Sequence, residues 1–333
     1  MHAAAFSPRG GVAPKTTSLR GQGLIEYVLI IAIIGLVIVF AGPGVAGAIR
    51  NQFNLVGNTV NSGTNGGTEG GAAGGGSASA DSATVQAAIA KDAKDWTLDE
   101  QEAVAEDIAA KGEASSAYAK AKAAMDAGTK WSIKLTDGKT MQYRIIGINH
   151  DNLAGGSGKA GLTFLTTSTG IQSRMNASKS NKGGWEQSEL RQKMNSGEIW
   201  NLMPADFQSK VKAVTKLTNN EGGGRAHKNA AVTATSDKLF LLSYSEIVPT
   251  SYWASSYPWT SSEGTQYEAF QGKVTNNFSR NSAIAIGNRW WERSVSVSPN
   301  DYDSFLSVGA DGDPTGKFDL ATNLYCVCPA FCF

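Results

Sequence analysis

Cysteine and histidine are scarce in this sequence, which holds three of each among 333 residues. The histidines, His2, His150 and His227, lie far apart, so neither a zinc site nor a His-based catalytic triad has the spacing that it needs. An excess of charge is also absent, because 30 Lys and Arg residues stand against 29 Asp and Glu residues. This balance indicates no basic face for nucleic acid, and we predict no metal and no cofactor.

The three cysteines, Cys326, Cys328 and Cys332, all lie at the end of the chain. Cys326 and Cys328 are two residues apart, which places them on one face of a strand, where a disulfide between such near neighbours is strained. We expect buried free thiols or one local disulfide. The odd number also permits an intersubunit disulfide.

Formal charge is missing from the run between Leu24 and Ala41 except at Glu26. At about 1.5 Å per residue, a helix of this length crosses a bilayer core of roughly 30 Å. The basic residues ahead of the run are expected to stay in the cytoplasm, so the C-terminus points outward. A secretory signal would have a shorter apolar region, followed by a small-x-small cleavage site.

The stretch "GQGLIEY" resembles the class III signal of type IV pilins, most closely those of the Flp/Tad branch. The resemblance implies that a prepilin peptidase cuts after Gly21, so that residues 1–21 are a leader peptide and Gln22 begins the mature chain. Glu26 is then the fifth mature residue, and Tyr27 follows it. Pro43 lies where proline interrupts the helix of many type IV pilins.

Elementary electrostatics agrees with a role for Glu26 in assembly. Cleavage ahead of Gln22 creates an α-amino group that is positive at neutral pH. In a filament of packed helices, Glu26 could neutralise that amine on a neighbouring subunit and so favour the correct register. The alternative is that Glu26 merely lies at the lipid headgroups of a simple signal anchor.

Residues 22–60 are predicted to form a hydrophobic assembly helix with a kinked or extended break at Gly42 to Gly44. Beyond the break, apolar residues recur at helical spacing: Val45, Ile49, Phe53, Val56 and Val60. Residues 61–82 are rich in glycine and serine and predict a flexible linker.

Residues 83–129 are rich in alanine and mixed charge, and they predict a short helical spacer. Thr97 and Glu100 form a capping-box pattern at the start of one helix, which Gly112 ends. A second helix is expected to end at Gly128. The apolar face of the first helix is predicted to comprise Leu98, Val104, Ile108 and Ala109.

From Lys130 onward the pattern changes to strands and turns, so we expect an α+β chain with a mixed α/β globular domain at 130–333. "WSIKL" and "MQYRIIGI" flank a hairpin turn at Asp137-Gly138. "GLTFLTT", "SFLSVGA" and "LYCVCPAFCF" are further candidate strands, and "DKLFLLSYSEI" predicts a strand followed by a turn. Two short helices are expected within residues 183–214.

A second resemblance covers most of 130–333. It rests on "WEQSELRQKMNSGEIWNLMP", "DKLFLLSYSEI", "WWERSVS", "FLSVGADGDP" and "VCPAF", in that order. These motifs are similar to secreted bacterial domains with the C-type-lectin-like fold of sulfatase-modifying (formylglycine-generating) proteins. That fold hosts enzymes, sugar binders and variable ligand binders. Cys328 stands where such domains often carry arginine, and the cysteine spacing does not match the active-site pair of the enzymes.

Two groups of residues are candidate ligand sites. "SYWASSYPWTSSEG" concentrates Tyr252, Trp253, Tyr257 and Trp259 in a loop, where aromatic rings could stack on sugars or instead fill the core. By contrast, "WWERS" predicts two core tryptophans, Trp290 and Trp291.

The stretch "DGDPTGKFD" places Asp311, Asp313 and Asp319 close together, as in a calcium loop. It lacks the alternation and the bidentate glutamate of an EF-hand. We therefore favour a β-turn at Asp311-Gly312.

Three functions compete. The first is a pilin subunit without enzymatic activity, made in the cytoplasmic membrane, which the pilus assembly machinery polymerises into a homo-oligomeric extracellular filament. Its lectin-like domain would bind glycans or a cell surface. The second is a minor or tip adhesin, or another membrane-anchored binding protein. The third is a membrane-anchored enzyme of the formylglycine-generating type.

Overall fold

The structure is a computed structural model that describes residues 81–333, apart from 169, 250–252, 277–279 and 315–318. The predicted leader 1–21, the assembly helix 22–60 and nearly all of the linker 61–82 lie outside the described residues. Gly21, Gln22, Glu26 and Tyr27 lie outside them as well. The described part belongs to one compact unit, which begins at Gly76. No helix in that described part is both long and apolar enough to cross a membrane.

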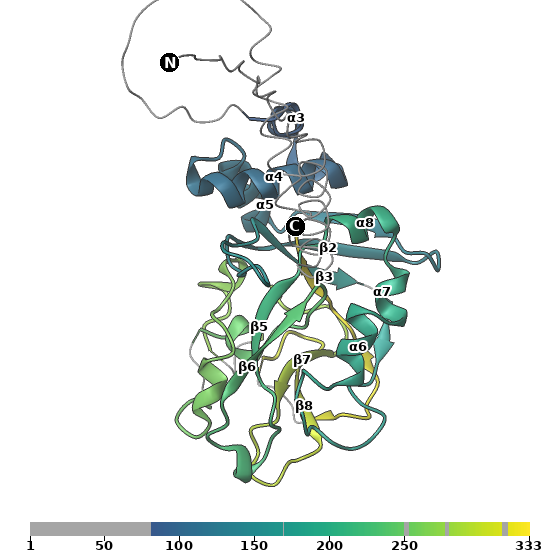
Figure 1. The fold of residues 1–333 in the computed structure, drawn as a ribbon, viewed down its shortest axis with the longest axis vertical. Coiled ribbons are helices and arrows are strands. Elements are labelled where there is room, and N and C mark those ends of the chain that lie inside the picture. The colour runs from purple at the N-terminus through teal and green to yellow at the C-terminus, as the bar shows by residue number, and fades with distance from the viewer. Residues whose placement is uncertain (1–80, 169, 250–252, 277–279, 315–318) are drawn as a thin grey trace, which may run out of the picture. The chain divides into compact units, whose positions relative to one another are not determined.

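The described residues form an α+β arrangement of short elements (Figure 1). The helices are α3 (Ala83–Ala90), η1 (Ala93–Asp95), α4 (Leu98–Lys111), η2 (Gly112–Ala114), α5 (Tyr118–Ala127), α6 (Glu189–Asn195), α7 (Glu198–Leu202), α8 (Ala205–Lys210), η3 (Arg225–His227), α9 (Tyr244–Ile247), η4 (Pro258–Ser261) and η5 (Glu268–Phe270). The strands are β1 (Lys130–Lys134), β2 (Thr140–Ile148), β3 (Leu162–Ser168), β4 (Gln172–Ser173), β5 (Val214–Asn219), β6 (Val232–Asp237), β7 (Trp290–Val295), β8 (Ser304–Val308), β9 (Asp319–Leu320), β10 (Tyr325–Cys326) and β11 (Ala330–Cys332).

The described strands form three sheets. The first has the order β1-β2-β3-β11, the second β4-β10-β7-β8-β9, and the third is the β5–β6 pair. All pairs are antiparallel except β10 with β7. The last strand, β11, therefore returns to the first sheet beside β3, while β10, only a few residues earlier, belongs to the second.

The helical segment, residues 83–129, begins with a helix that was not predicted, α3, but α4 starts as the sequence predicts. The Thr97 side chain accepts the Glu100 amide, and the Glu100 carboxylate accepts the Thr97 amide, so the capping box is confirmed. α4 ends at Gly112 and α5 at Gly128, also as predicted. The predicted apolar face was wrong at Ala109, which is exposed; Ala105 takes its place beside Val104 and Ile108 in the core.

The β1–β2 hairpin is confirmed. Gly138 has φ of 85°, a conformation that favours glycine, and it follows Asp137 at the turn. Residues the same number of positions before and after Asp137 in the sequence pair across the hairpin. Trp131 therefore lies opposite Tyr143. Because neighbouring residues of a strand point to opposite sides, these two aromatic side chains share the side of the hairpin that faces the helical segment.

The helical segment and the sheet share one hydrophobic core. α4 packs so closely on the start of β3 that a Cβ on Gly161 would lie 1.8 Å from the carbonyl oxygen of Ala105. Val104 and Ile108 of α4 belong to the same buried cluster as Phe164 of β3. In Figure 1, α3, α4 and α5 gather over β2 and β3. Residues 83–129 are thus part of the core that the sheet builds.

The chain enters this unit at a fixed point. Asp81 forms an ion pair with Lys111 at the end of α4, with Oδ1 and Nζ 2.7 Å apart. Its other carboxylate oxygen accepts a hydrogen bond from the Ser116 hydroxyl. The first described residue is therefore tied to the junction between α4 and α5.

Two predictions of secondary structure are corrected. Residues 183–214 hold three short helices, α6, α7 and α8, because Gly197 and Pro204 separate the second and third from what precedes them. "DKLFLLSYSEI" is not a strand: after one bridge from Phe240 to Ala330, a capping box at Ser243 starts α9. The four apolar residues of this stretch, Leu239 to Leu242, are all buried. A continuous apolar run has no alternation, so the pattern alone does not distinguish a buried strand from another buried segment.

Candidate functional site

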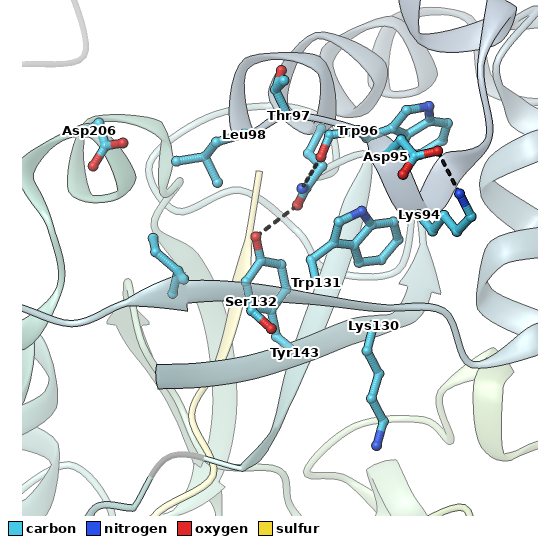
Figure 2. A pocket seen from close by; sticks show the side chains of 12 residues that line it. Lys94, Asp95, Trp96, Thr97, Leu98, Lys130, Trp131, Ser132, Tyr143 and Asp206 are labelled. Carbon is cyan, nitrogen blue, oxygen red and sulfur yellow. Dashed lines mark hydrogen bonds and ion pairs between the residues drawn. The ribbon is translucent and has the colours of Figure 1, made fainter. Parts of the chain in front are cut away.

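A pocket of about 490 Å³ opens between the helical segment and the β1–β2 hairpin (Figure 2). A volume of this size is typical of small-molecule sites. η1 and the start of α4 supply one side, β1 and β2 supply another, and α8 contributes Asp206. Its lining includes Trp96, Thr97, Trp131, Ser132, Tyr143 and Asp206.

Three aromatic rings form the wall of the pocket. The Trp96 and Trp131 rings stack at 13°, with their centroids 6.2 Å apart. Tyr143 lies on the other side of Trp131, at 6.3 Å and 26°. The three rings are only 2–5% exposed and belong to the buried core, so they form the rigid back of the pocket and expose little of their own surface to it.

Hydrogen bonds hold the three rings in place. Trp96 Nε1 donates to the Ala88 carbonyl at 2.8 Å, and Trp131 Nε1 donates to the Ala93 carbonyl at 2.9 Å. The Tyr143 hydroxyl donates to Gln101 Oε1 at 3.1 Å. Burial raises the pKa of Tyr143 to about 12, so the phenol keeps its proton at neutral pH.

Polar groups surround this wall. Lys94 and Asp95 form an exposed ion pair with Nζ and Oδ2 2.7 Å apart, and Asp206 lies across the pocket from them (Figure 2). No Cys or His belongs to this lining. The pocket therefore combines an apolar wall with hydroxyl and carboxylate groups.

For the aromatic residues of the 251–264 loop, a sugar site and the core were both left open, and the structure places two of them in the core. Tyr257 is 7% exposed and Trp259 3% exposed, and their rings pack edge to face with centroids 6.2 Å apart. Trp253 is half-buried against the core, and Tyr252 lies outside the described residues. This region has few regular helices or strands, so large aromatic side chains fill its interior instead. Trp290 and Trp291 are fully buried, as predicted.

The three aspartates of "DGDPTGKFD" do not converge. Asp311 pairs with Arg280, and the turn at Asp311-Gly312 closes through the Gly312 amide and the Gly309 carbonyl. Asp319 lies on β9, where its carboxylate accepts from Arg289 and Tyr325. Among the described residues no group of three His, Cys, Asp or Glu side chains could hold a metal ion. The β-turn prediction is confirmed.

A chain of buried charges lies away from the pocket. Lys216 Nζ is 2.6 Å from Asp151 Oδ1 and 2.5 Å from Glu246 Oε1. Arg293 Nη1 is 2.5 Å from the other oxygen of Glu246. The Tyr267 hydroxyl also donates to Asp151, at 2.9 Å from Oδ2. Four alternating charges thus join β5, α9 and β7 to the loop after β2.

The carboxyl groups of this region have pKa values shifted in opposite directions. Burial opposes ionisation of Asp151, but Lys216 and His150 outweigh it and lower the pKa to about 2. For Glu263 burial dominates over the attraction of Arg293 and raises the pKa to about 7. Burial and the charge of Glu263 raise the pKa of Glu292 well above its ordinary value, and neither oxygen of Glu292 has a hydrogen-bond partner among the described residues.

We expect the stability of the protein to fall as pH rises from about 4.5 to 7. In that window folded Glu263 keeps a proton that the unfolded chain has lost, so its contribution is complete below pH 4.5 and is lost by pH 7. The loss amounts to about 3 kcal/mol at 1.36 kcal/mol per pKa unit. Denaturant unfolding at several pH values in this range should show that the unfolding free energy of Glu263→Gln falls less steeply with pH than that of the wild type. Glu198→Gln removes an exposed carboxylate and is the control, so its pH dependence should match the wild type. Equal slopes for all three proteins would contradict the prediction.

All three cysteines are free. Burial raises the pKa of Cys328 and Cys332, and the nearby charge of Asp151 raises that of Cys332 further. Cys332 Sγ lies 3.7 Å from an Asp151 oxygen. These two thiols are therefore protonated at neutral pH, where a thiol is a weak nucleophile.

Residues 160–333 match the family described as "Domain of unknown function (DUF6273)". The chain belongs to the DUF6273 family. Neither the curated proteins nor the solved structures contain a match to it. The DUF6273 segment starts between β2 and β3, so of the six pocket residues named above only Asp206 lies inside it.

The aromatic wall of this DUF6273 protein was not predicted, although two local signals for it are present in the sequence. The hairpin register alone pairs Trp131 with Tyr143. Trp96 directly precedes the capping box at Thr97, at the N′ position where an apolar residue often packs back onto its helix. No local pattern indicates that α4 brings Trp96 onto Trp131, because that contact depends on tertiary packing.

Proposed function

We propose that this protein is a pilin-type subunit that polymerises through residues 22–60 into an extracellular filament. It displays its DUF6273-containing unit on the outside of that filament. The displayed unit binds a small ligand, such as a glycan of a cell surface, in the pocket walled by Trp96, Trp131 and Tyr143. The C-type-lectin-like fold remains part of this proposal.

The observation that carries the proposal is the spacing of the N-terminal motif. Gly21, Glu26 and Tyr27 stand ahead of a long apolar run at the positions that a class III signal requires. A Gly/Ser-rich segment follows, and the compact unit begins at Gly76, within that segment. This order of assembly segment, tether and folded unit suits a subunit whose folded part is displayed.

The pocket supports binding as the task of the displayed unit. Its aromatic wall is fixed by hydrogen bonds to the backbone, so little side-chain entropy is lost when a ligand docks. Protonated, buried thiols at Cys328 and Cys332 favour binding over thiol chemistry. A minor or tip adhesin would use the same helix and the same pocket. It would differ from a major subunit only in its abundance along the filament.

The test is Glu26→Gln in the full chain, made in the bacterium that carries it. The substitution preserves the shape of the side chain but removes the charge that neutralises the incoming α-amino group. We expect mature protein that begins at Gln22 and a surface with no filaments or very few. Mass spectrometry of the N-terminus and electron microscopy of the cells measure the two results.

Glu69→Gln is the matched control, because it removes the same charge from the Gly/Ser-rich segment; it should leave both processing and filaments intact. Normal filaments in the Glu26→Gln strain would refute the assembly role. A wild-type protein with its first 21 residues intact would refute the pilin proposal altogether. Immunogold labelling along whole filaments distinguishes a major subunit from one confined to the tip.

A further inference from the structure

Two cations face each other on the side of the β1–β2 hairpin away from the aromatic wall. Lys130 and Arg144 are directly paired across the two strands. Figure 2 shows Lys130 directed away from the indole rings. Like charges at directly opposed positions of an antiparallel pair repel each other and destabilise the sheet. Within the described residues, neither side chain forms an ion pair with a carboxylate.

Arg144 is the more unusual of the two because it is 8% exposed. One of its nitrogens, Nη2, donates to the Ala283 carbonyl, and the guanidinium lies over the Phe270 ring at 5.9 Å. Its Nε is buried and has no acceptor in the part of the chain that the structure describes. Burial lowers the pKa of Arg144. A buried charge without a counter-ion is costly, so this position is expected to have one when the protein functions.

Both cations line a cavity of about 260 Å³ between the sheet and the 282–286 segment. Hydroxyl groups of Thr167 and Ser282 belong to the same lining. A second cavity of about 180 Å³ shares Thr167 and Ile286 with it and carries the amides of Gln172 and Asn288. A neutral, hydrogen-bonding space thus lies next to the cationic cavity.

We propose that these adjacent cavities bind an anionic sugar, whose carboxylate, phosphate or sulfate group lies between Lys130 and Arg144. Arginine and lysine donors pair strongly with such oxyanions. The hydroxyl groups of the sugar would meet Thr167, Gln172 and Asn288. The site meets the aromatic pocket at Lys130, which lines both that pocket and the cationic cavity, and it does not depend on the assembly of filaments.

The test is isothermal titration of the purified full chain with glucuronate, glucose 6-phosphate and glucose 6-sulfate, and with glucose as the uncharged probe. We expect saturable binding of at least one anionic sugar and at least tenfold weaker binding of glucose. The three anions distinguish a carboxylate site from a phosphate or sulfate site. Arg144→Met should weaken the binding at least tenfold, and Lys130→Gln should weaken it several-fold.

Lys134→Gln is the matched control, because Lys134 is an exposed lysine on the same side of β1 that does not line either cavity. It should bind as the wild type does. Circular dichroism confirms that each variant is folded, and if Arg144→Met is not, the exposed Lys130 decides the outcome. Equal affinity of Lys130→Gln and wild type, or no saturable binding of any anionic sugar, would overturn the proposal.

Discussion

Replacing Glu246 with alanine is expected to lower the free energy of unfolding by about 3–5 kcal/mol. Glu246 is fully enclosed and holds Lys216 with one oxygen and Arg293 with the other. Its removal leaves Lys216 paired with Asp151, and it leaves Arg293 without an ion pair among the described residues. Burial opposes the charged form of Glu246, but Arg293 and Lys216 lower its pKa, so the carboxylate is ionised when the protein is most stable.

The measurement is denaturant unfolding followed by tryptophan fluorescence. Glu198→Ala provides the control, because Glu198 is 70% exposed and forms only a surface ion pair with Lys193. Its loss should change the free energy of unfolding by less than about 1 kcal/mol. A Glu246→Ala protein as stable as this control would show that the buried charges do not stabilise the fold as a unit.

Trp259→Ala is the second substitution with a large expected effect, about 3–5 kcal/mol of unfolding free energy. The indole is 3% exposed and packs against Tyr257, so its removal leaves a cavity that neighbouring side chains cannot fill. Trp253→Ala should cost less because that ring is only half-buried.

The same unfolding experiment distinguishes a core residue from a ligand-binding one. Leu324→Ala, at a side chain 65% exposed, is the control for removing a large apolar group from the surface. If Trp259→Ala is as stable as Leu324→Ala and loses ligand instead, the ring belongs to a binding surface. A cooperative transition shifted to much lower denaturant assigns it to the core.

Local features of this fold were predictable from the sequence. The capping box at Thr97 and the turn at Asp137-Gly138 each depend on residues fewer than five positions apart. For the same reason, Gly112 and Gly128 predict the ends of their helices correctly. Such patterns act through the backbone of their own segment and need no tertiary contact.

Long-range features were not predictable. Asp151, Lys216, Glu246 and Arg293 form one chain of charges although Asp151 and Lys216 are 65 residues apart and Glu246 and Arg293 are 47 apart. Nothing in the sequence around any one of them indicates burial. The same limit applies to Trp259, since an aromatic residue in a loop-like sequence fits the core and the surface equally well until its neighbours are known.

The ion pair between Asp81 and Lys111, together with the Ser116 contact, has a mechanical consequence. On a displayed subunit, a load applied through the preceding linker would reach the junction of α4 and α5 before any strand. α4 packs directly against Gly161, just before β3, so this junction is connected to the first sheet through closely packed backbones. The hydrogen bonds between β1 and β2, which position the aromatic wall, would not be broken one after another by this load. In the proposed filament, the pocket between the helical segment and the hairpin should therefore keep its shape when the preceding segment is under tension.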